Sequence, residues 1–181
     1  MTGGYRPWSK FNRYTWSVLN RYGHMGFLAT LAFLGFGWVT FDGAIMKRED
    51  PNHALTVAPG VVEWVLRRNR SGHYFSPGLI NGQPVRFLLD TGATHTSVPA
   101  HLAQSLGLRP GAPSTVSTAN GTVTVRATRI DALDIGPFRF AGAPAHLNPG
   151  MRDDVLLGMS VLKHLEFTQR GDVLVLRKPA G

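Results

Sequence analysis

The chain has 181 residues, of which 43% are hydrophobic and 17% charged, and its formal net charge is +8. This length and composition suit one ordinary domain with an appendage, and they argue against a disordered chain or a collagen-like repeat. The absence of Cys excludes disulfide scaffolds, thiolate metal sites, iron–sulfur clusters and cysteine nucleophiles. The excess of 19 Lys and Arg over 11 Asp and Glu has to be located along the chain.

The N-terminal part combines basic and aromatic residues with an uncharged run. Residues 1–21 contain Lys and Arg but no acid, and residues 22–41 contain no Asp, Glu, Lys or Arg. Read as a helix, 22–41 spans about 30 Å, which is the thickness of the hydrocarbon core of a bilayer. The positive flank lies before the run. The positive-inside rule therefore predicts a transmembrane helix over 22–41 with 1–21 in the cytoplasm.

Three other interpretations of this segment remain open. A cleaved signal peptide would have a shorter apolar stretch followed by small residues, whereas residues 38–42 read Trp-Val-Thr-Phe-Asp. A buried helix of a soluble domain is compatible with the glycines in the run. A basic aromatic arm that binds nucleic acid would use the same Arg, Tyr and Trp residues. Residues 42–60 contain Pro and polar residues, so we expect them to form a linker.

Residues 61–181 are punctuated by turn signals about every ten residues, such as Asn81-Gly82 and Asn120-Gly121. Between the turns lie segments rich in β-forming residues, at 61–66, 85–89, 122–130, 138–140 and 173–176. Short strands at regular spacing predict an all-β barrel or sandwich. Two short helices are expected, at 99–106 and 158–165, from their leucine spacing and from the proline and glycine around the first.

The residues that suggest chemistry follow the apolar segment 85–89, where the sequence reads Asp90-Thr91-Gly92-Ala93. An acid at the end of a buried strand, beside a hydroxyl and a glycine that permits close backbone approach, is what an aspartic protease needs. Here the sequence resembles the retropepsin-like aspartic proteases, specifically their bacterial, membrane-anchored members, and the resemblance covers about 61–176. It includes Asn120-Gly121 where that family has its substrate-covering flap hairpin. Leu156-Leu157-Gly158 matches the family's element that packs beside the catalytic loop and precedes a short helix.

The resemblance implies a retropepsin-like closed β-barrel, the acid protease fold, with one or two short helices in 61–181. It implies the catalytic residues Asp90, Thr91 and Gly92, and, for substrate binding in the flap and cleft, Ala93, Ala119, Asn120 and Gly121. No cofactor is implied. No metal site is expected either, because the seven histidines show no His-Glu-x-x-His pattern. Thr94 and Met159 stand where viral members usually have Asp and Arg, so details of the dimer interface and the substrate preference do not carry over.

Peptide hydrolysis by this chemistry needs two carboxylates that share one site. The chain has one Asp-Thr-Gly, so a second Asp90 must come from a second chain, which predicts a C2 homodimer. The expected partners are that second copy, a peptide or protein substrate and, through one N-terminal helix, a membrane; no nucleic acid is expected. The predicted location is the bacterial inner membrane, single-pass, with the catalytic domain in the periplasm. Two alternatives stay open: a non-catalytic dimerisation or peptide-binding module of the same fold, and nucleic-acid binding through the basic excess.

Overall fold

The structure is a computed structural model, and it describes residues 49–118 and 121–179. The predicted cytoplasmic segment 1–21 and the predicted transmembrane helix 22–41 lie outside the described residues. Within the described part of the chain, no helix is both long and apolar enough to cross a bilayer.

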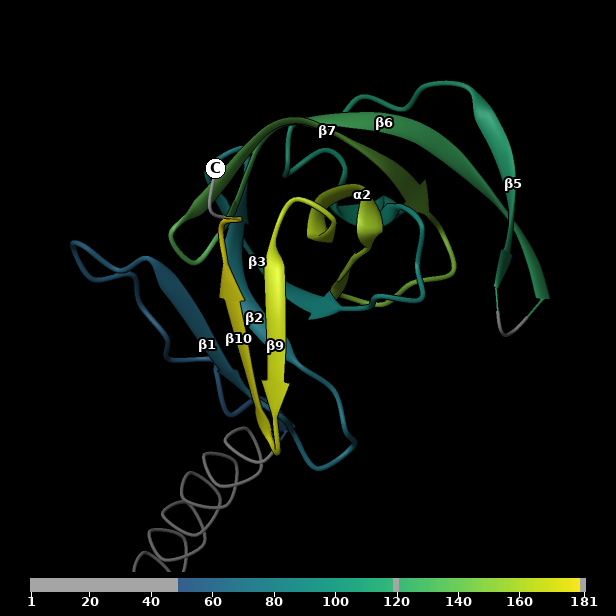
Figure 1. Cartoon of the computed structure of the whole chain (residues 1–181). Coiled ribbons are helices and arrows are strands. Elements are labelled where there is room, and N and C mark those ends of the chain that lie inside the picture. Colours follow the sequence, from purple (N-terminus) through teal and green to yellow (C-terminus); the bar gives the residue numbers. More distant parts are fainter. Residues whose placement is uncertain (1–48, 119–120, 180–181) are drawn as a thin grey trace, which may run out of the picture. The chain divides into compact units, whose positions relative to one another are not determined.

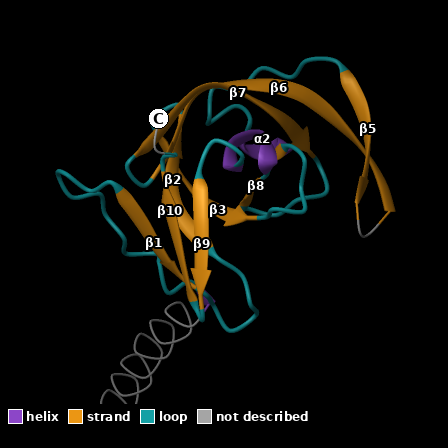
Figure 2. Ribbon diagram, viewed as in Figure 1, coloured by secondary structure: helices purple, strands orange, loops and turns teal. Residues whose placement is uncertain are grey.

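The described residues form an all-β domain with two short helices (Figure 2). The strands are β1 (Glu63–Arg67), β2 (Phe75–Ile80), β3 (Gln83–Leu89), β4 (Thr96–Pro99), β5 (Pro113–Thr118), β6 (Gly121–Ile135), β7 (Phe138–Asn148), β8 (Val155–Leu157), β9 (Glu166–Arg170) and β10 (Val173–Arg177). The helices are the 3₁₀ turn η1 (Ala100–Leu102) and α2 (Met159–Leu162). The two helices are shorter than the segments 99–106 and 158–165 expected from the sequence, and the predicted all-β class of 61–181 is confirmed.

Seven strands pair in the order β2-β3-β8-β4-β7-β6-β5, and an additional pairing of β2 with β6 closes six of them into a barrel. β5 lies outside the closed ring, as the outer strand of a hairpin with β6 (Figure 1). Closure depends on Gly78, which lies opposite Ile135 where β2 meets β6. A Cβ at this position would overlap the carbonyl oxygen of Asp134 and the ring of Phe87. Glycine therefore lets the two strands meet without displacing the core.

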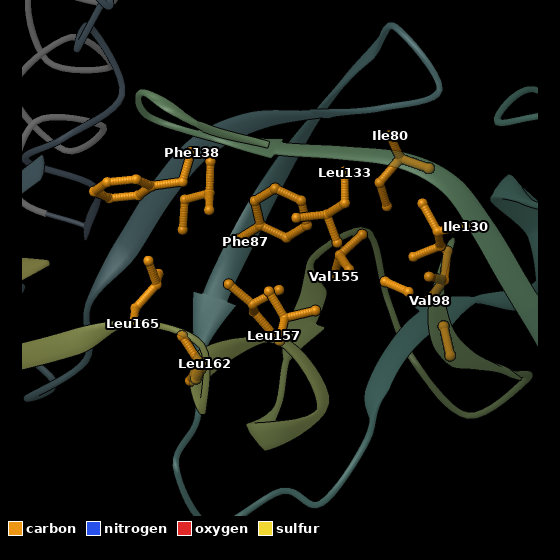
Figure 3. Close-up of a cluster of buried hydrophobic side chains, with 14 of the residues drawn as sticks. Ile80, Phe87, Val98, Ile130, Leu133, Phe138, Val155, Leu157, Leu162 and Leu165 are labelled. Atoms are coloured by element: carbon orange, nitrogen blue, oxygen red, sulfur yellow. The ribbon is translucent and has the colours of Figure 1, made fainter. Parts of the chain in front are cut away.

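The barrel interior is filled by aliphatic side chains and a few aromatic ones from nearly every strand. Figure 3 labels Ile80, Phe87, Val98, Ile130, Leu133, Phe138, Val155, Leu157, Leu162 and Leu165 in this cluster. Buried residues alternate with more exposed ones along β1, β8, β10 and parts of β6 and β7, as expected where one face of a sheet packs inward. Burial of this apolar surface is the main stabilising contribution to the fold.

A second, three-stranded antiparallel sheet has the order β1-β10-β9. One face of it buries Trp64 and Leu66 of β1 and Leu174 and Leu176 of β10. The indole N–H of Trp64 donates a hydrogen bond to the Ser76 hydroxyl of β2 at 2.8 Å, and both residues are buried. The small sheet is therefore joined to the barrel by both apolar packing and a buried polar contact.

Part of the segment expected to be a linker, 42–60, is attached to the domain. Asn52 is buried, and its Oδ1 accepts a hydrogen bond from the N–H of Arg67 at 2.8 Å. Its Nδ2 donates to the carbonyl oxygens of Arg67 and Phe75, both at 2.8 Å. The Asp50 carboxylate, also buried, accepts from the N–H of Asn52 at 3.0 Å. The folded part of the chain accordingly begins before residue 61, where the sequence placed its start.

Candidate active site

Asp90 lies directly after β3, where that strand runs parallel to β8 in the middle of the barrel sheet. Leu89 is paired with Leu157, and the N–H of Asp90 donates to the carbonyl oxygen of Leu157 at 3.1 Å. The N–H of Ala93 then donates to the carbonyl oxygen of Asp90 at 3.3 Å and turns the chain. The buried neighbouring strand thus sets where Asp90 leaves the sheet.

The carboxylate of Asp90 is oriented by its own loop. Its Oδ1 accepts a hydrogen bond from the N–H of Gly92 at 2.8 Å. Within the described residues, Oδ1 is the one oxygen of this side chain that accepts a hydrogen bond. Asp90 itself is half-buried. Thr91 and Gly92 are exposed. One carboxylate oxygen is therefore held by the backbone, and the other is available to a group from outside the loop.

The start of α2 packs directly against the Asp90 loop. The N–H of Met159 donates to the carbonyl oxygen of Ala93 at 2.8 Å, and the N–H of Ser160 donates to that of Thr94 at 2.9 Å. Gly158, which precedes the helix, is buried and lies against the carbonyl oxygens of Ala93 and His95. The predicted contact between the Leu156-Leu157-Gly158 element and the Asp90 loop is thereby confirmed, as is the short helix after it.

A hydroxyl pair that sequence reasoning missed connects the same two segments. Thr96, with none of its surface accessible, donates its N–H to the Ser160 hydroxyl at 3.0 Å. The two hydroxyl oxygens are 3.2 Å apart, so they also hydrogen-bond to each other. Ser and Thr are common in strands and turns, and Thr96 and Ser160 are 64 residues apart, so no local sequence pattern predicts that their hydroxyls meet. Only the packing of α2 beside β4 reveals this contact.

Two histidines lie together near the site. His95, in the loop after Asp90, has its ring centroid 4.6 Å from that of His146 on β7. Burial lowers the pKa of His146 below its ordinary value, and the nearby His95 lowers this pKa further. Within the described residues, no group of three or more His, Asp or Glu side chains is arranged to hold a metal ion.

The predicted substrate-binding residues fall on two segments. Ala93 lies in the Asp90 loop, and Gly121 begins β6 at the tip of the β5–β6 hairpin. Thr118 and Gly121 are paired across this hairpin, and the Thr118 hydroxyl donates to the carbonyl oxygen of Gly121 at 2.8 Å. Ala119 and Asn120 lie outside the described residues. The structure therefore brings Asp90, Thr91, Gly92 and Ala93 into one loop and places the predicted flap on a hairpin.

Comparisons with known proteins agree with this geometry. A family model described as "gag-polyprotein putative aspartyl protease" matches residues 76–164, which include the Asp90 loop and α2. The crystal structure of a retropepsin-like aspartic protease from Rickettsia conorii has a TM-score of 0.55 and 30% sequence identity to this chain. That match covers 64% of this chain and 90% of the other.

Two curated relatives are uncharacterised proteins. One, from the cobV 5′ region of a Sinorhizobium species, is 34% identical over 149 residues, covering 79% of this chain and 62% of that protein. The other, from Rickettsia prowazekii, is 30% identical over 120 residues, covering 64% of this chain and 52% of that protein. The match with this chain thus spans less than two thirds of the length of either relative.

Proposed function

Because this chain belongs to the retropepsin-like aspartic proteases, we propose that it is an endopeptidase in which two Asp90 carboxylates of a homodimer activate a water. The observation that carries the proposal is the position of Asp90 at the end of β3. There the N–H of Gly92 holds one carboxylate oxygen at 2.8 Å and leaves the other for the reaction. The substrate is a peptide or a protein.

Two carboxylates are needed because the reaction requires an acid and a base at the same time. Like charges about 3 Å apart cannot both be ionised, so two facing Asp90 side chains share one proton. The ionised carboxylate takes a proton from the water as this water attacks the peptide carbonyl carbon. The protonated carboxylate donates its proton to the carbonyl oxygen. The tetrahedral intermediate then collapses as the amine leaves with a proton.

The neighbours of Asp90 have supporting roles in this proposal. Thr91, which is exposed, hydrogen-bonds across the dimer to the partner's loop, and Gly92 allows the two backbones to approach. Ala93 lines the cleft. The tip of the β5–β6 hairpin, with Ala119, Asn120 and Gly121, covers the bound peptide, excludes water and adds backbone hydrogen bonds in the manner of strand addition.

We also propose that the chain is anchored in a bacterial inner membrane by a single helix over 22–41, with its N-terminus in the cytoplasm and its catalytic domain in the periplasm. Support comes from the sequence, in which an uncharged run of membrane-spanning length follows a basic segment. Anchoring two copies in one membrane raises their effective concentration and favours the homodimer.

The test is peptide-library cleavage by the full-length chain and by its Asp90→Asn variant, which is nearly isosteric. We expect Asp90→Asn to reduce cleavage to background while the fold and the dimer persist. Asp131→Asn, an exposed acid outside the Asp90 loop, serves as the matched control and should cleave like the wild type. Undiminished cleavage by Asp90→Asn would refute the proposal. A wild-type dimer without any cleavage from acidic to neutral pH would favour the non-catalytic module.

A further inference from the structure

The long strand β7 has an edge that is only partly covered. Residues 145–148 pair with β4, whereas within the described residues the part from Phe138 to Pro144 pairs with no strand other than β6. A crevice of about 460 Å³ runs beside this part of β7. All of residues 139–144 line it, although the side chains of a strand alternate between its two faces. The crevice therefore follows the edge of β7 rather than one of its faces.

The turn between β6 and β7 determines which backbone groups point into the crevice. Gly136, with a φ of +52°, begins a two-residue turn between Ile135 and Phe138. In hairpins of this type the two residues that flank the turn form a hydrogen-bonded pair. Because N–H and C=O groups alternate in direction along a strand, those of Arg139 and Ala141 point away from β6. Within the described residues no other backbone group bonds to them, so they can pair with another extended chain.

Two segments form the other side of the crevice. Val161 of α2 and His164 just after it lie beside β7 (Figure 1), and Lys178 and Pro179 follow β10. Val161 is buried, and the ring centroid of His164 lies 6.2 Å from that of Phe140 on β7. Phe140, Val161 and Pro179 therefore offer apolar surface to the side chains of an extended chain.

The charge of the crevice favours an acidic occupant. Arg139, His164 and Lys178 line it, and among the described residues no Asp or Glu does. Arg139 is paired with Asp134 through two hydrogen bonds, of 2.6 and 2.8 Å, which hold its guanidinium in place. In the same part of the chain neither Lys178 nor His164 has a carboxylate partner. Lys178 is a cation at neutral pH and His164 becomes one in acid, so the crevice attracts negative charge.

Resting on the protease function proposed above, we propose that this crevice binds an extended, acidic segment of the protein substrate as an added strand on β7. A polypeptide suits the edge because its own N–H and C=O groups can pair with those of Arg139 and Ala141. These backbone hydrogen bonds supply affinity. Lys178 and His164 then select segments that carry Asp or Glu side chains.

The crevice is distinct from the catalytic loop but borders on its support. Asp90 does not line it, whereas Ser160 does. The N–H of Ser160 bonds to the carbonyl oxygen of Thr94, in the loop after Asp90. A segment bound here is therefore a second point of attachment, separate from the bond that is cleaved. Such an attachment raises the effective concentration of the rest of the substrate at Asp90.

The first test measures binding without cleavage, in the full-length chain with Asp90→Asn. The probe is a fluorescein-labelled peptide of alternating Glu and Val, and a peptide of alternating Lys and Val is its control. We expect the Glu-Val peptide to bind about tenfold more tightly or better by fluorescence anisotropy, and added Lys178→Glu to remove this advantage. Arg109→Glu, at an exposed position outside the crevice, is the charge-matched control and should bind normally. Equal binding of the two peptides would overturn the proposal.

The second test addresses the backbone pairing. Ala141→Pro removes an N–H that points away from β6, so the barrel should keep its fold while the Glu-Val peptide loses its binding. Ala141→Ser keeps the N–H and should bind normally. Without any change in the edge, N-methylated peptides test the same pairing, because only alternate N–H groups of an added strand face β7. Methylation of one alternate set should abolish binding and methylation of the other set should not. Equal binding of both methylated peptides would refute strand addition.

The third test concerns the role in substrate recognition. Two substrates share one cleavage sequence from the peptide library, and one of them carries the Glu-Val segment on flexible Gly/Ser linkers of several lengths. We expect the wild-type KM to be about tenfold lower or more for the extended substrate, with kcat unchanged. Lys178→Glu should remove this difference and cleave the short substrate normally. Equal KM values at every linker length would refute the role in substrate recognition.

The outcomes separate this inference from the protease proposal. If the wild-type chain cleaves the short substrate and the Asp90→Asn chain does not bind the Glu-Val peptide, the crevice is refuted as a binding site while the protease stands. If the peptide binds in a manner that depends on Lys178 and Ala141 but the wild-type chain cleaves nothing, the protease is refuted together with the role of the crevice in substrate recognition.

Discussion

Glycines at two positions determine how closely backbone atoms approach Asp90. A Cβ on Gly92 would lie 3.2 Å from Oδ1 of Asp90, the oxygen that the Gly92 N–H binds. A Cβ on Gly158 would lie 2.5 Å from the carbonyl oxygen of His95 and 2.7 Å from that of Ala93. The Ala93 carbonyl also accepts the first hydrogen bond from α2, so it cannot move without disturbing the helix. The shape of the loop therefore depends on the absence of a Cβ at Gly92 and Gly158 as much as on Asp90 itself.

Gly158→Ala should lower both stability and activity, because its methyl group meets two backbone carbonyls of the Asp90 loop. We expect the free energy of unfolding to fall by about 1–3 kcal/mol in urea denaturation. We expect kcat/KM for a peptide to fall with it. Gly150→Ala is the control, since a Cβ there meets only the side-chain oxygen of Asn148, at 3.3 Å. Equal losses in the two variants would contradict the explanation.

His146 makes stability depend on pH. Its pKa is lowered from the ordinary value of 6.5, first by burial and then by His95. The folded chain therefore binds fewer protons at His146 than the unfolded chain does between the two pKa values. The contribution of His146 is complete above the unfolded pKa and is lost as the pH falls toward the folded one. His146→Gln should reduce the shift of the urea midpoint between about pH 7.5 and about pH 5.

The control for this prediction is His73→Gln, which removes an exposed histidine from the turn between β1 and β2. This variant should keep the wild-type dependence of the urea midpoint on pH. If His146→Gln retains the full wild-type dependence, the lowered pKa of His146 does not contribute to acid sensitivity.

The longest hairpin, β6–β7, explains why the sequence indicated the strands but not their lengths. The predicted segments ended at Ile130 and Phe140, whereas the strands run to Ile135 and Asn148. The buried residues of β6 are Val125, Ile130, Leu133 and Ile135, so burial changes from an odd to an even position and back to odd ones within one strand. Gly142, with a φ of +63°, lies near this point on β7 and marks a bend of the barrel. A pattern of period two cannot show a strand that bends.

The candidate site also has parts that the sequence predicted and parts that it did not. The Asp90-Thr91-Gly92 loop and the element ending at Gly158 were identifiable because they are contiguous motifs with a recognisable order. The contacts between Thr96 and Ser160 and between His95 and His146 were not, since each joins residues from segments far apart in the chain. Such contacts depend on how β4, β7 and α2 pack, and nothing in the local sequence specifies that packing.

Asn52 makes the segment before β1 part of the folded domain. Asn52→Ala removes the partners of the Arg67 N–H and of two carbonyl oxygens, those of Arg67 and Phe75. We expect the free energy of unfolding to fall by about 1–3 kcal/mol in urea denaturation, because these backbone groups lose their hydrogen bonds. Asn52→Asp keeps an acceptor for the Arg67 N–H but turns a buried carboxylate oxygen toward the two carbonyl oxygens, so it should lose at least as much. A wild-type midpoint for Asn52→Ala would show that this attachment contributes nothing to stability.

At the scale of the whole molecule, the described domain is half of the proposed enzyme. It has one Asp90 loop and one candidate flap hairpin on β5 and β6. Every catalytic event in the proposal therefore depends on the association of two copies. Catalysis should follow the concentration of dimer rather than that of chain.

Mixing wild-type chain with an equal amount of Asp90→Asn chain tests this dependence directly. If the copies exchange freely and a dimer needs both carboxylates, about one quarter of the dimers remain active. Cleavage per total chain should therefore fall to about one quarter of the wild-type value. Mixing with Asp131→Asn in place of Asp90→Asn should leave cleavage unchanged. A fall to one half would mean that each copy works alone.

The parallel pairing of β3 with β8 has a consequence for the order of folding. Leu89 is joined to Leu157 across the sheet, and the loop after it is held by Met159 and Ser160. A chain emerging from a ribosome presents Asp90 long before it presents these partners. Pairings this distant in sequence require the closure of a long loop and tend to form late. The catalytic loop therefore takes its working shape only once nearly the whole domain has been synthesised, and a nascent chain truncated before residue 157 lacks the β8 and α2 contacts that fix this loop in the sheet.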